Sequence, residues 1–353
     1  MTYRVIQWAT GFTARKAVQA MAERPDYEIV AGFVYDAAKA GRDLGEICET
    51  RKLGVAVTND RQKIIDTEAD CVLFLASAEM DLASSLRDVC DLLASGKNVT
   101  ATSTQFVYPK GISAEFEGDI AAACKRGGTT FHGLGVMPGF VSEGVALMMT
   151  RLSRRIDQMS AYESLVYDKY PSHFQMFDCM GFGYEPDDPT PMFTNLEFVG
   201  HVWRPSAVLL AEAAGIKIDE AQCFRDVVVA DHDFEVASGF IRKGTVAAMN
   251  FGVRIISEGR PVIVMQHYTR MDPNLAPDWP RGEGWTLVFE GVPSMSVKIN
   301  VGIHDEDHTD QGCWTAAMNA VHAVPYVIDA KPGILSLADV PPVWGTDAFR
   351  RVK

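Results

Sequence analysis

The chain has 353 residues, and 33 Lys and Arg stand against 46 Asp and Glu, which gives a formal net charge of −13. Hydrophobic residues make up 47% and charged residues 22%, which excludes a disordered chain, a collagen and a coiled-coil rod. The acidic balance argues against nucleic-acid coating and against adhesion to anionic membranes, because both partners attract clustered Lys and Arg.

Strands and helices alternate through the first part of the chain. Tyr3–Trp8 is rich in β-forming residues, and Arg15–Glu23 then has apolar residues at helical spacing. Further strands are expected at Tyr27–Tyr35, Cys71–Ala76, Asn98–Thr102 and Thr129–Leu134, with helices at Asp81–Ala94 and Ser113–Lys125. Repeated βαβ units predict an α/β domain with a doubly wound parallel sheet over residues 1–135.

The pattern changes after about residue 155, where strands follow one another with few helices. A second domain of α+β type with a largely antiparallel sheet is therefore expected over 136–310. Its strands are predicted at Gln158–Tyr167, Cys223–Ala230, Thr245–Ser257, Pro261–Thr269, Gly284–Glu290 and Ser294–Gly302, with a helix at Ser206–Ala214. A late helix at Gln311–Asp329, with Pro325 as a kink or break, is expected to pack back with 311–353 on the first domain.

Seven cysteines are spread widely and none pairs at C-x-x-C spacing, which favours reduced thiols in a cytoplasmic protein. No secretory signal and no apolar run long enough to span a membrane is found. The histidines and carboxylates form no H-E-x-x-H or similar spacing, so we expect no catalytic metal. A G-x-S-x-G elbow and a P-loop are also missing.

A degenerate G-x-G-x-x-G pattern lies between the first strand and the first helix. It is carried by Ala9, Thr10, Gly11, Phe12, Thr13 and Ala14. Gly11 leaves room for a pyrophosphate, small Ala14 allows close helix–strand packing, and the helix N-terminus offers free N–H groups. The position after a strand and before a helix predicts a dinucleotide site, with an ordinary tight turn as the alternative.

Asp36 follows the second strand, 22 residues after Ala14. A carboxylate there accepts hydrogen bonds from an adenosine ribose and repels a 2′-phosphate, which favours NAD(H). Lys39 and Arg42 act in the opposite direction and leave NADP(H) open. The alternative is an Asp that only caps a turn.

Two polar loops follow the strands at 71–76 and 98–102, at the edge where doubly wound sheets bind ligands. Cofactor contacts are expected from Ala76, Ser77, Ala78, Thr102 and Ser103. Thr104 and Gln105 should face the reacting carbon. Local hydrogen bonding within the loops is the alternative.

Tyr167, Tyr170 and His173 follow the first strand of the second domain. Aromatic hydroxyls and an imidazole on such a loop are candidate proton donors. A single histidine is more often a surface or core residue, and this interpretation also stays open.

The chain resembles the dihydrodipicolinate reductase-like group that includes 2,4-diaminopentanoate dehydrogenase and the native amine dehydrogenases. The resemblance runs through nearly the whole chain. It is carried by VIQWATGFTARKAVQAM at 5–21, GRDLGEI at 41–47, NVTATSTQFVYP at 98–109, HGLGVMPGF at 132–140, MGFG at 180–183 and AMNAVHAVPYVIDAKPGILSLADVPPV at 317–343. It implies a Rossmann domain, a second domain whose sheet serves a homodimer, an active site in the cleft between them, and a small-molecule substrate.

Members of this group reduce an imine formed from a ketone and ammonia, or run the reverse oxidative deamination. The resemblance implies hydride transfer between a nicotinamide and a small or medium apolar carbonyl or imine, with Met137, Phe140 and Tyr108 beside the substrate. Amine dehydrogenases carry a glutamate in the loop before the Tyr-Pro pair, where this chain has Gln105, or Thr104 if the alignment shifts by one residue. An amide cannot act as a carboxylate base, so reduction of a carbonyl or C=C bond without ammonia, or cofactor sensing without catalysis, remain alternatives. The His-His-rich motif of dihydrodipicolinate reductases proper is not found.

Overall fold

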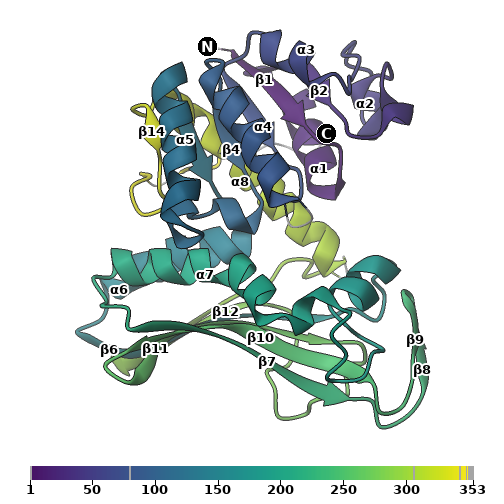
Figure 1. The fold of residues 1–353 in the computed structure, drawn as a ribbon, viewed down its shortest axis with the longest axis vertical. Helices are drawn as coiled ribbons and strands as arrows, with labels where there is room; N and C mark the ends of the chain where they lie inside the picture. Colours follow the sequence, from purple (N-terminus) through teal and green to yellow (C-terminus); the bar gives the residue numbers. More distant parts are fainter. Residues whose placement is uncertain (1, 79–80, 305–306, 342, 347, 349–353) are drawn as a thin grey trace. The chain divides into compact units, whose positions relative to one another are not determined.

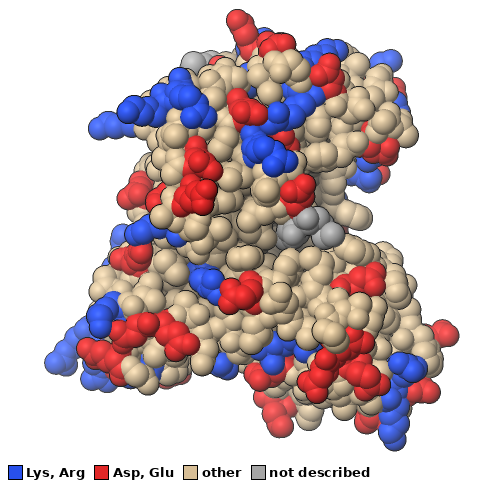
Figure 2. Space-filling view, in the orientation of Figure 1, with Lys and Arg blue, Asp and Glu red and all other residues tan. Residues whose placement is uncertain are grey.

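The computed structural model describes residues 2–78, 81–304, 307–341, 343–346 and 348. The chain divides into two compact units. The first unit comprises Met1–Phe140 with Thr309–Lys353, and the second comprises Val141–His308. On the face shown in Figure 2, Lys and Arg are interspersed with Asp and Glu. No described helix is long and apolar enough to cross a membrane.

The first unit is built on a six-stranded sheet in which every pair is parallel (Figure 1). Its strands are β1 (Tyr3–Trp8), β2 (Tyr27–Phe33), β3 (Cys71–Phe74), β4 (Asn98–Ala101), β5 (Thr130–Gly133) and β14 (Gly333–Ile334). The strand order is β14-β5-β4-β3-β1-β2. Strands β3 and β5 are buried along their whole length, as expected for a parallel sheet covered on both faces.

Helices cover both faces of this sheet. The helices of the unit are α1 (Phe12–Ala22), α2 (Leu44–Ile47), α3 (Arg61–Asp66), α4 (Leu82–Ala94), α5 (Ala114–Gly127) and α8 (His308–Asp329), with short turns η1 (Ala37–Lys39), η2 (Thr104–Phe106) and η3 (Pro109–Gly111). Buried residues of α4 and α5 join one hydrophobic core, and those of α1 and α8 join another. The predicted doubly wound α/β arrangement is confirmed, and α8 packs on this sheet.

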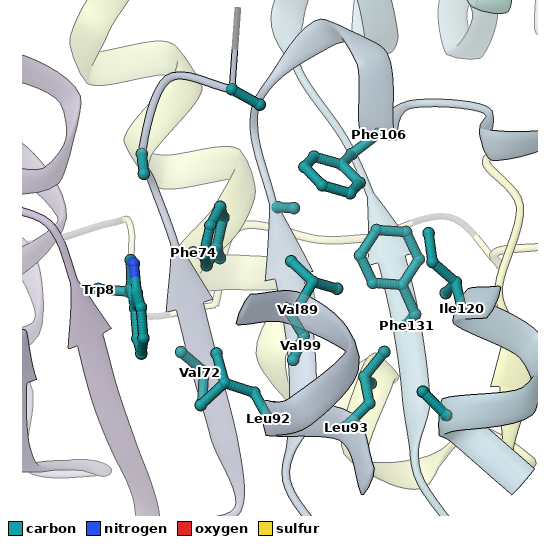
Figure 3. Close-up of a cluster of buried hydrophobic side chains, with 14 of the residues drawn as sticks. Trp8, Val72, Phe74, Val89, Leu92, Leu93, Val99, Phe106, Ile120 and Phe131 are labelled. Carbon is teal, nitrogen blue, oxygen red and sulfur yellow. The ribbon is translucent and has the colours of Figure 1, made fainter. Parts of the chain in front are cut away.

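A row of aromatic rings fills the core under α4 and α5 (Figure 3). The Trp8 ring stacks on Phe33 at 4.0 Å and on Phe74 at 5.6 Å between centroids. Phe106 then lies 6.1 Å from Phe74 and 5.7 Å from Phe131. Because Phe106 is fully buried in η2, this row anchors the loop that follows β4.

Helix α8 continues through Pro325, so of the two expected effects of this proline the break does not occur. A proline in a helix leaves the carbonyl four residues earlier without its usual donor. That carbonyl belongs to Val321, and the Tyr27 hydroxyl donates a hydrogen bond to it at 2.7 Å. A side chain from β2 therefore replaces the missing backbone bond.

The second unit contains a mixed six-stranded sheet of order β13-β12-β6-β11-β10-β7. The strands are β6 (Arg155–Val166), β7 (Glu220–Val229), β10 (Val246–Ser257), β11 (Arg260–Arg270), β12 (Gly284–Val292) and β13 (Met295–Ile299). Within the described part of this second sheet, β6 and β11 are the only strands that pair in parallel, so the expected largely antiparallel sheet is confirmed. A hairpin of β8 (Phe234–Val236) and β9 (Gly239–Ile241) was not predicted.

Helices α6 (Ala146–Thr150) and α7 (Leu196–Ala213) belong to this unit, together with η5 (Phe174–Cys179) and η6 (Met192–Thr194). The turns of η4 (Val136–Val145) lead into it and are not helical at Met137–Gly139. Helix α7 starts well before the predicted Ser206, because Asn195 caps it by accepting a hydrogen bond from the Glu197 N–H.

Candidate active site

A sharp bend joins β1 to α1. Ala9 has φ of 73°, in the left-handed region that is rare outside glycine. Gly11 has φ of −74°, an angle open to any residue. A Cβ atom added at Gly11 would meet nothing within 4 Å. The space beside Gly11 is thus open, as a bend that admits a pyrophosphate requires.

The first turn of α1 lacks a side-chain cap among the described residues. By contrast, Asp81 caps α4 and Ser113 caps α5. The leading N–H groups of α1 are therefore left for another acceptor, such as a phosphate oxygen. Phe12 is 69% exposed, whereas Ala14 is fully buried. Thr13 is half-buried.

The side chain of Gln7, which the sequence analysis did not single out, forms hydrogen bonds to the backbone of the bend. Its side chain is fully buried, and its amide nitrogen donates to the carbonyls of Trp8 at 3.0 Å and Ala9 at 3.2 Å. A polar residue inside the apolar run of the first strand is the signal that could have indicated this role. Gln7 orients the peptide groups at the point where the chain turns.

Asp36 and Lys39 lie on the turn after β2. The Asp36 carboxylate caps η1 by accepting a hydrogen bond from the Ala38 N–H at 2.9 Å, and its side chain is exposed. The capping alternative is therefore realised, although the second carboxylate oxygen is not used by that bond. Lys39 Nζ donates to the Thr10 hydroxyl at 3.4 Å. A cation thus lies against the bend at 9–12.

The loops after β3 and β4 are joined by a hydrogen bond. The Ala78 N–H donates to the Ser103 hydroxyl at 3.1 Å. Ser77 is exposed beside buried Ala76 and Ala78, and Thr102 is half-buried. The two loops therefore form one surface at the carboxyl ends of adjacent strands.

Gln105 lies in the loop after β4 and is 2% exposed. Its amide oxygen accepts hydrogen bonds from Ser103 at 2.9 Å and from Thr104 at 3.3 Å. No described residue accepts a hydrogen bond from its amide nitrogen. The two hydroxyls fix the amide so that its nitrogen can act as a donor to a ligand.

Tyr108, Met137 and Phe140 also belong to the first unit. Tyr108 and Met137 are half-buried, and Phe140 is 47% exposed. The Phe140 N–H donates to the Gly135 carbonyl at 2.8 Å, and Asn319 of α8 donates to the same carbonyl at 2.9 Å. The return helix therefore shapes the segment that presents Phe140.

The predicted proton donors of the second unit fall into two places. Tyr167 and Tyr170 lie together, with ring centroids 5.6 Å apart. His173 instead stacks on Phe177 at 4.3 Å, and its Nδ1 lies 2.8 Å from the Ser238 carbonyl oxygen. His173 therefore supports the β8–β9 hairpin in this structure.

The structure adds a buried polar cluster beside Tyr167 that the sequence analysis missed. Glu163 of β6 lies in register with His267 of β11 and with Trp285 of β12. The Tyr167 and His267 ring centroids are 6.2 Å apart. A carboxylate between the apolar residues Ala161 and Leu165 was the available signal. Within the described part of the chain, no group of three or more His, Cys, Asp and Glu side chains could hold a metal ion.

Comparison with known proteins identifies the family. The model of the 2,4-diaminopentanoate dehydrogenase C-terminal domain matches residues 140–349. An amine dehydrogenase from Streptomyces virginiae is 30% identical over 344 residues, which is 95% of each chain. A 2,4-diaminopentanoate dehydrogenase from Acetoanaerobium sticklandii is 24% identical over 254 residues, covering 69% of this chain and 66% of the relative.

A solved structure agrees with the fold. The amine dehydrogenase from Mycobacterium smegmatis superposes with a TM-score of 0.77 at 20% identity, covering 98% of this chain and 97% of that one. The family match spans more than half of the chain, and the 30% identical relative spans nearly all of it. This chain therefore belongs to the family of 2,4-diaminopentanoate dehydrogenase and the amine dehydrogenases, and it is an oxidoreductase.

Proposed function

We propose that this oxidoreductase uses a nicotinamide dinucleotide to aminate a small or medium, largely apolar ketone, or to deaminate the corresponding amine. The observation that carries the proposal is the open bend at Gly11 in front of a helix that no described side chain caps. Membership of the family supports the same chemistry.

The residues present fit such a cofactor. The N–H groups at Gly11–Ala14 would hold the pyrophosphate, with Lys39 and Thr10 beside them. The exposed Asp36 carboxylate would accept hydrogen bonds from the adenosine ribose, which favours NAD(H) over NADP(H). Residues 76–78 and 102–103 would also contact the bound cofactor. When bound, the nicotinamide would supply or accept the hydride.

The proposed reaction balances without any other reactant. A ketone, ammonium and the reduced nicotinamide give the neutral amine, the oxidised nicotinamide and water. The carbonyl oxygen leaves as water, and the hydride reaches the former carbonyl carbon. Gln105 would orient the substrate through its amide nitrogen, with Thr104 beside it. Tyr167 and Tyr170 are the proposed proton donors, and Met137, Phe140 and Tyr108 would contact the apolar part of the substrate.

A second function is favoured by Gln105 itself. Its amide is uncharged and therefore cannot attract an ammonium ion as a carboxylate does. Its amide oxygen already accepts hydrogen bonds from two hydroxyl groups. Reduction of a carbonyl or C=C bond without ammonia is therefore the rival proposal. Cofactor binding without turnover is a third outcome that the same assay separates.

The test is turnover of NADH and NADPH with a panel of ketones, with and without ammonium chloride. Ammonium-dependent turnover would support amination, and ammonium-independent turnover would establish the rival. Tight cofactor binding without turnover on ketones or enones would favour a sensor. A Gln105→Glu variant should raise ammonium-dependent turnover if this loop holds the reacting carbon.

We also propose that the protein is a cytoplasmic homodimer formed through the sheet of the second unit. All seven cysteines are free thiols, as in a reducing compartment. Light scattering after gel filtration should give twice the chain mass, and a mass equal to one chain would contradict the dimer.

A further inference from the structure

Gln7 is a buried polar residue near the end of β1, where its neighbours are apolar. Val5, two residues earlier on the same face of β1, belongs to the hydrophobic core that α1 and α8 cover. The Gln7 side chain is fully buried, so it points into this core. Its amide nitrogen lies 3.0 Å, 3.2 Å and 3.4 Å from the carbonyl oxygens of Trp8, Ala9 and Leu73. Because these neighbours are all acceptors, the amide faces the bend as a donor.

The peptide group between Trp8 and Ala9 is held by the sheet itself. The Trp8 carbonyl accepts a hydrogen bond from the Leu75 N–H at 3.2 Å, and the Ala9 N–H donates to the Phe33 carbonyl at 3.0 Å. Leu75 directly follows β3, and Phe33 is the last residue of β2. Backbone bonds to both neighbouring strands therefore fix the direction of this peptide group without a side chain.

The next peptide group, between Ala9 and Thr10, depends on Gln7. Its carbonyl oxygen accepts a hydrogen bond from the Gln7 amide at 3.2 Å, and no other described residue donates to it. Ala9 has φ of 73°, a conformation that costs an alanine free energy and persists only where the surroundings impose it. Among the described residues, Gln7 alone holds this carbonyl toward the interior.

The direction of that carbonyl fixes the direction of the Thr10 N–H. The bond between Ala9 and Thr10 is trans, and in a trans peptide group the C=O and N–H bonds point in opposite directions. The Thr10 N–H therefore points away from Gln7. It donates to no described residue, although Thr10 is only 6% exposed. A buried N–H without an acceptor is rare, and a phosphate oxygen at the start of α1 would supply the acceptor.

Stability alone does not account for an amide at this position. Gln7 Oε1 is buried and has no hydrogen-bond partner among the described residues. A buried acceptor without a donor lowers stability and offsets part of what the amide nitrogen contributes. An apolar residue of similar length, such as methionine, would avoid that cost. The part of the side chain that is used is the nitrogen that contacts the bend.

We propose that Gln7 is a positioning residue for the cofactor and sets the cofactor affinity without touching the cofactor. Its amide holds the Ala9 carbonyl inward, and the same peptide group thereby presents the Thr10 N–H to the pyrophosphate. This inference rests on the proposed function, because it needs a dinucleotide at the bend. It goes beyond that function by assigning control of the affinity to a residue inside the sheet.

The test is a fluorescence titration of NADH and NADPH into wild type, Gln7→Met and Gln7→Leu, with unfolding in urea to show that each variant is folded. Loss of the amide donor should weaken binding of the preferred cofactor about tenfold or more in both variants. Gln19→Met is the matched control, because it removes an amide of α1 that donates to the Cys48 carbonyl at 2.8 Å. Its affinity should stay within about twofold of wild type.

A second arm tests the route through Ala9. Glycine adopts the left-handed conformation without strain, so Ala9→Gly should make the bend less dependent on Gln7. The double variant of Gln7→Met with Ala9→Gly should bind the same cofactor about threefold or more tightly than Gln7→Met alone. A residue that merely stabilises the fold would show no such recovery, because the Kd is measured on folded protein.

The outcomes separate this inference from the proposed function. Wild type that binds neither cofactor would contradict the proposed function and the inference with it. Wild type that binds, with Gln7→Met and Gln7→Leu binding equally well, would overturn the inference alone. Equal affinities of Gln7→Met and the double variant would also overturn it, because the effect would then not run through the Ala9 carbonyl.

Discussion

Ala9 adopts a backbone conformation that suits glycine better than alanine. With φ of 73°, its Cβ approaches the neighbouring carbonyl, which costs about 1 kcal/mol. Ala9→Gly should therefore raise the free energy of unfolding by about 0.5–1 kcal/mol. Ala14→Gly is the matched control, because Ala14 is helical and its replacement should lower stability by about 1 kcal/mol. Urea denaturation of wild type and both variants measures the two changes in the free energy of unfolding. A lower free energy of unfolding for Ala9→Gly than for wild type would show that the bend is not strained.

Glu163 should make stability depend on pH. Burial raises its pKa to about 7 from an ordinary 4.5, so the folded chain holds the proton more tightly than the unfolded chain. The stability that this carboxyl contributes is complete below 4.5 and is lost as the pH rises through 7. His267 has the opposite pH dependence. Its pKa is lowered to about 3, so it reduces the stability of the folded chain only when the pH falls below about 6.5.

Glu163→Gln removes this dependence. The variant should gain stability relative to wild type between pH 5 and pH 8, by about 3 kcal/mol at most. Urea unfolding at several pH values measures the difference, with Glu290→Gln as the exposed control. If the free energy of unfolding changes with pH in the same way for wild type and Glu163→Gln, the pKa of this carboxyl is not raised by folding.

At the scale of elements, the continuity of α8 depends on one hydroxyl of β2. Tyr27 donates to the Val321 carbonyl that Pro325 leaves without a helical donor. Tyr27→Phe should lower the free energy of unfolding by about 1–2 kcal/mol, because a buried carbonyl would lose its partner. Tyr3→Phe is the control, since the described residues give the Tyr3 hydroxyl no hydrogen bond. Equal effects of the two substitutions would contradict the replacement of the backbone bond.

Elements with strong local patterns were predictable from the sequence. Strand β3 is apolar throughout and was found, and the bend at Gly11 was recognised from its place between a strand and a helix. Strand β14 has two residues and pairs only with β5, so no local pattern could reveal it. Glu163, His267 and Trp285 are far apart in sequence and meet only through the register of three strands. Such a cluster depends on pairing that periodicity does not specify.

At the scale of the whole molecule, the first unit needs both ends of the chain. Helix α8 returns to the sheet through its own apolar residues, and Lys16 of α1 forms an ion pair with Asp310 at 2.7 Å. The Lys16 ammonium also lies 5.0 Å from the Trp314 ring. The helix that carries the proposed phosphate site is thus held by the last part of the chain. The match to the amine dehydrogenase relative spans 95% of the chain, consistent with a single enzyme built from both units.

The central claim is that the bend at Gly11 holds a nicotinamide dinucleotide. The most direct measurement is a fluorescence titration of NADH into wild type and Gly11→Ser, with unfolding of both followed in urea. A serine there would cap α1 and leave stability equal or higher by up to about 1 kcal/mol, because its Cβ meets nothing within 4 Å. The account predicts saturable binding to wild type and an affinity weaker by about tenfold or more in Gly11→Ser. Wild-type protein that binds neither NADH nor NADPH, or a Gly11→Ser variant that binds as wild type does, would contradict it.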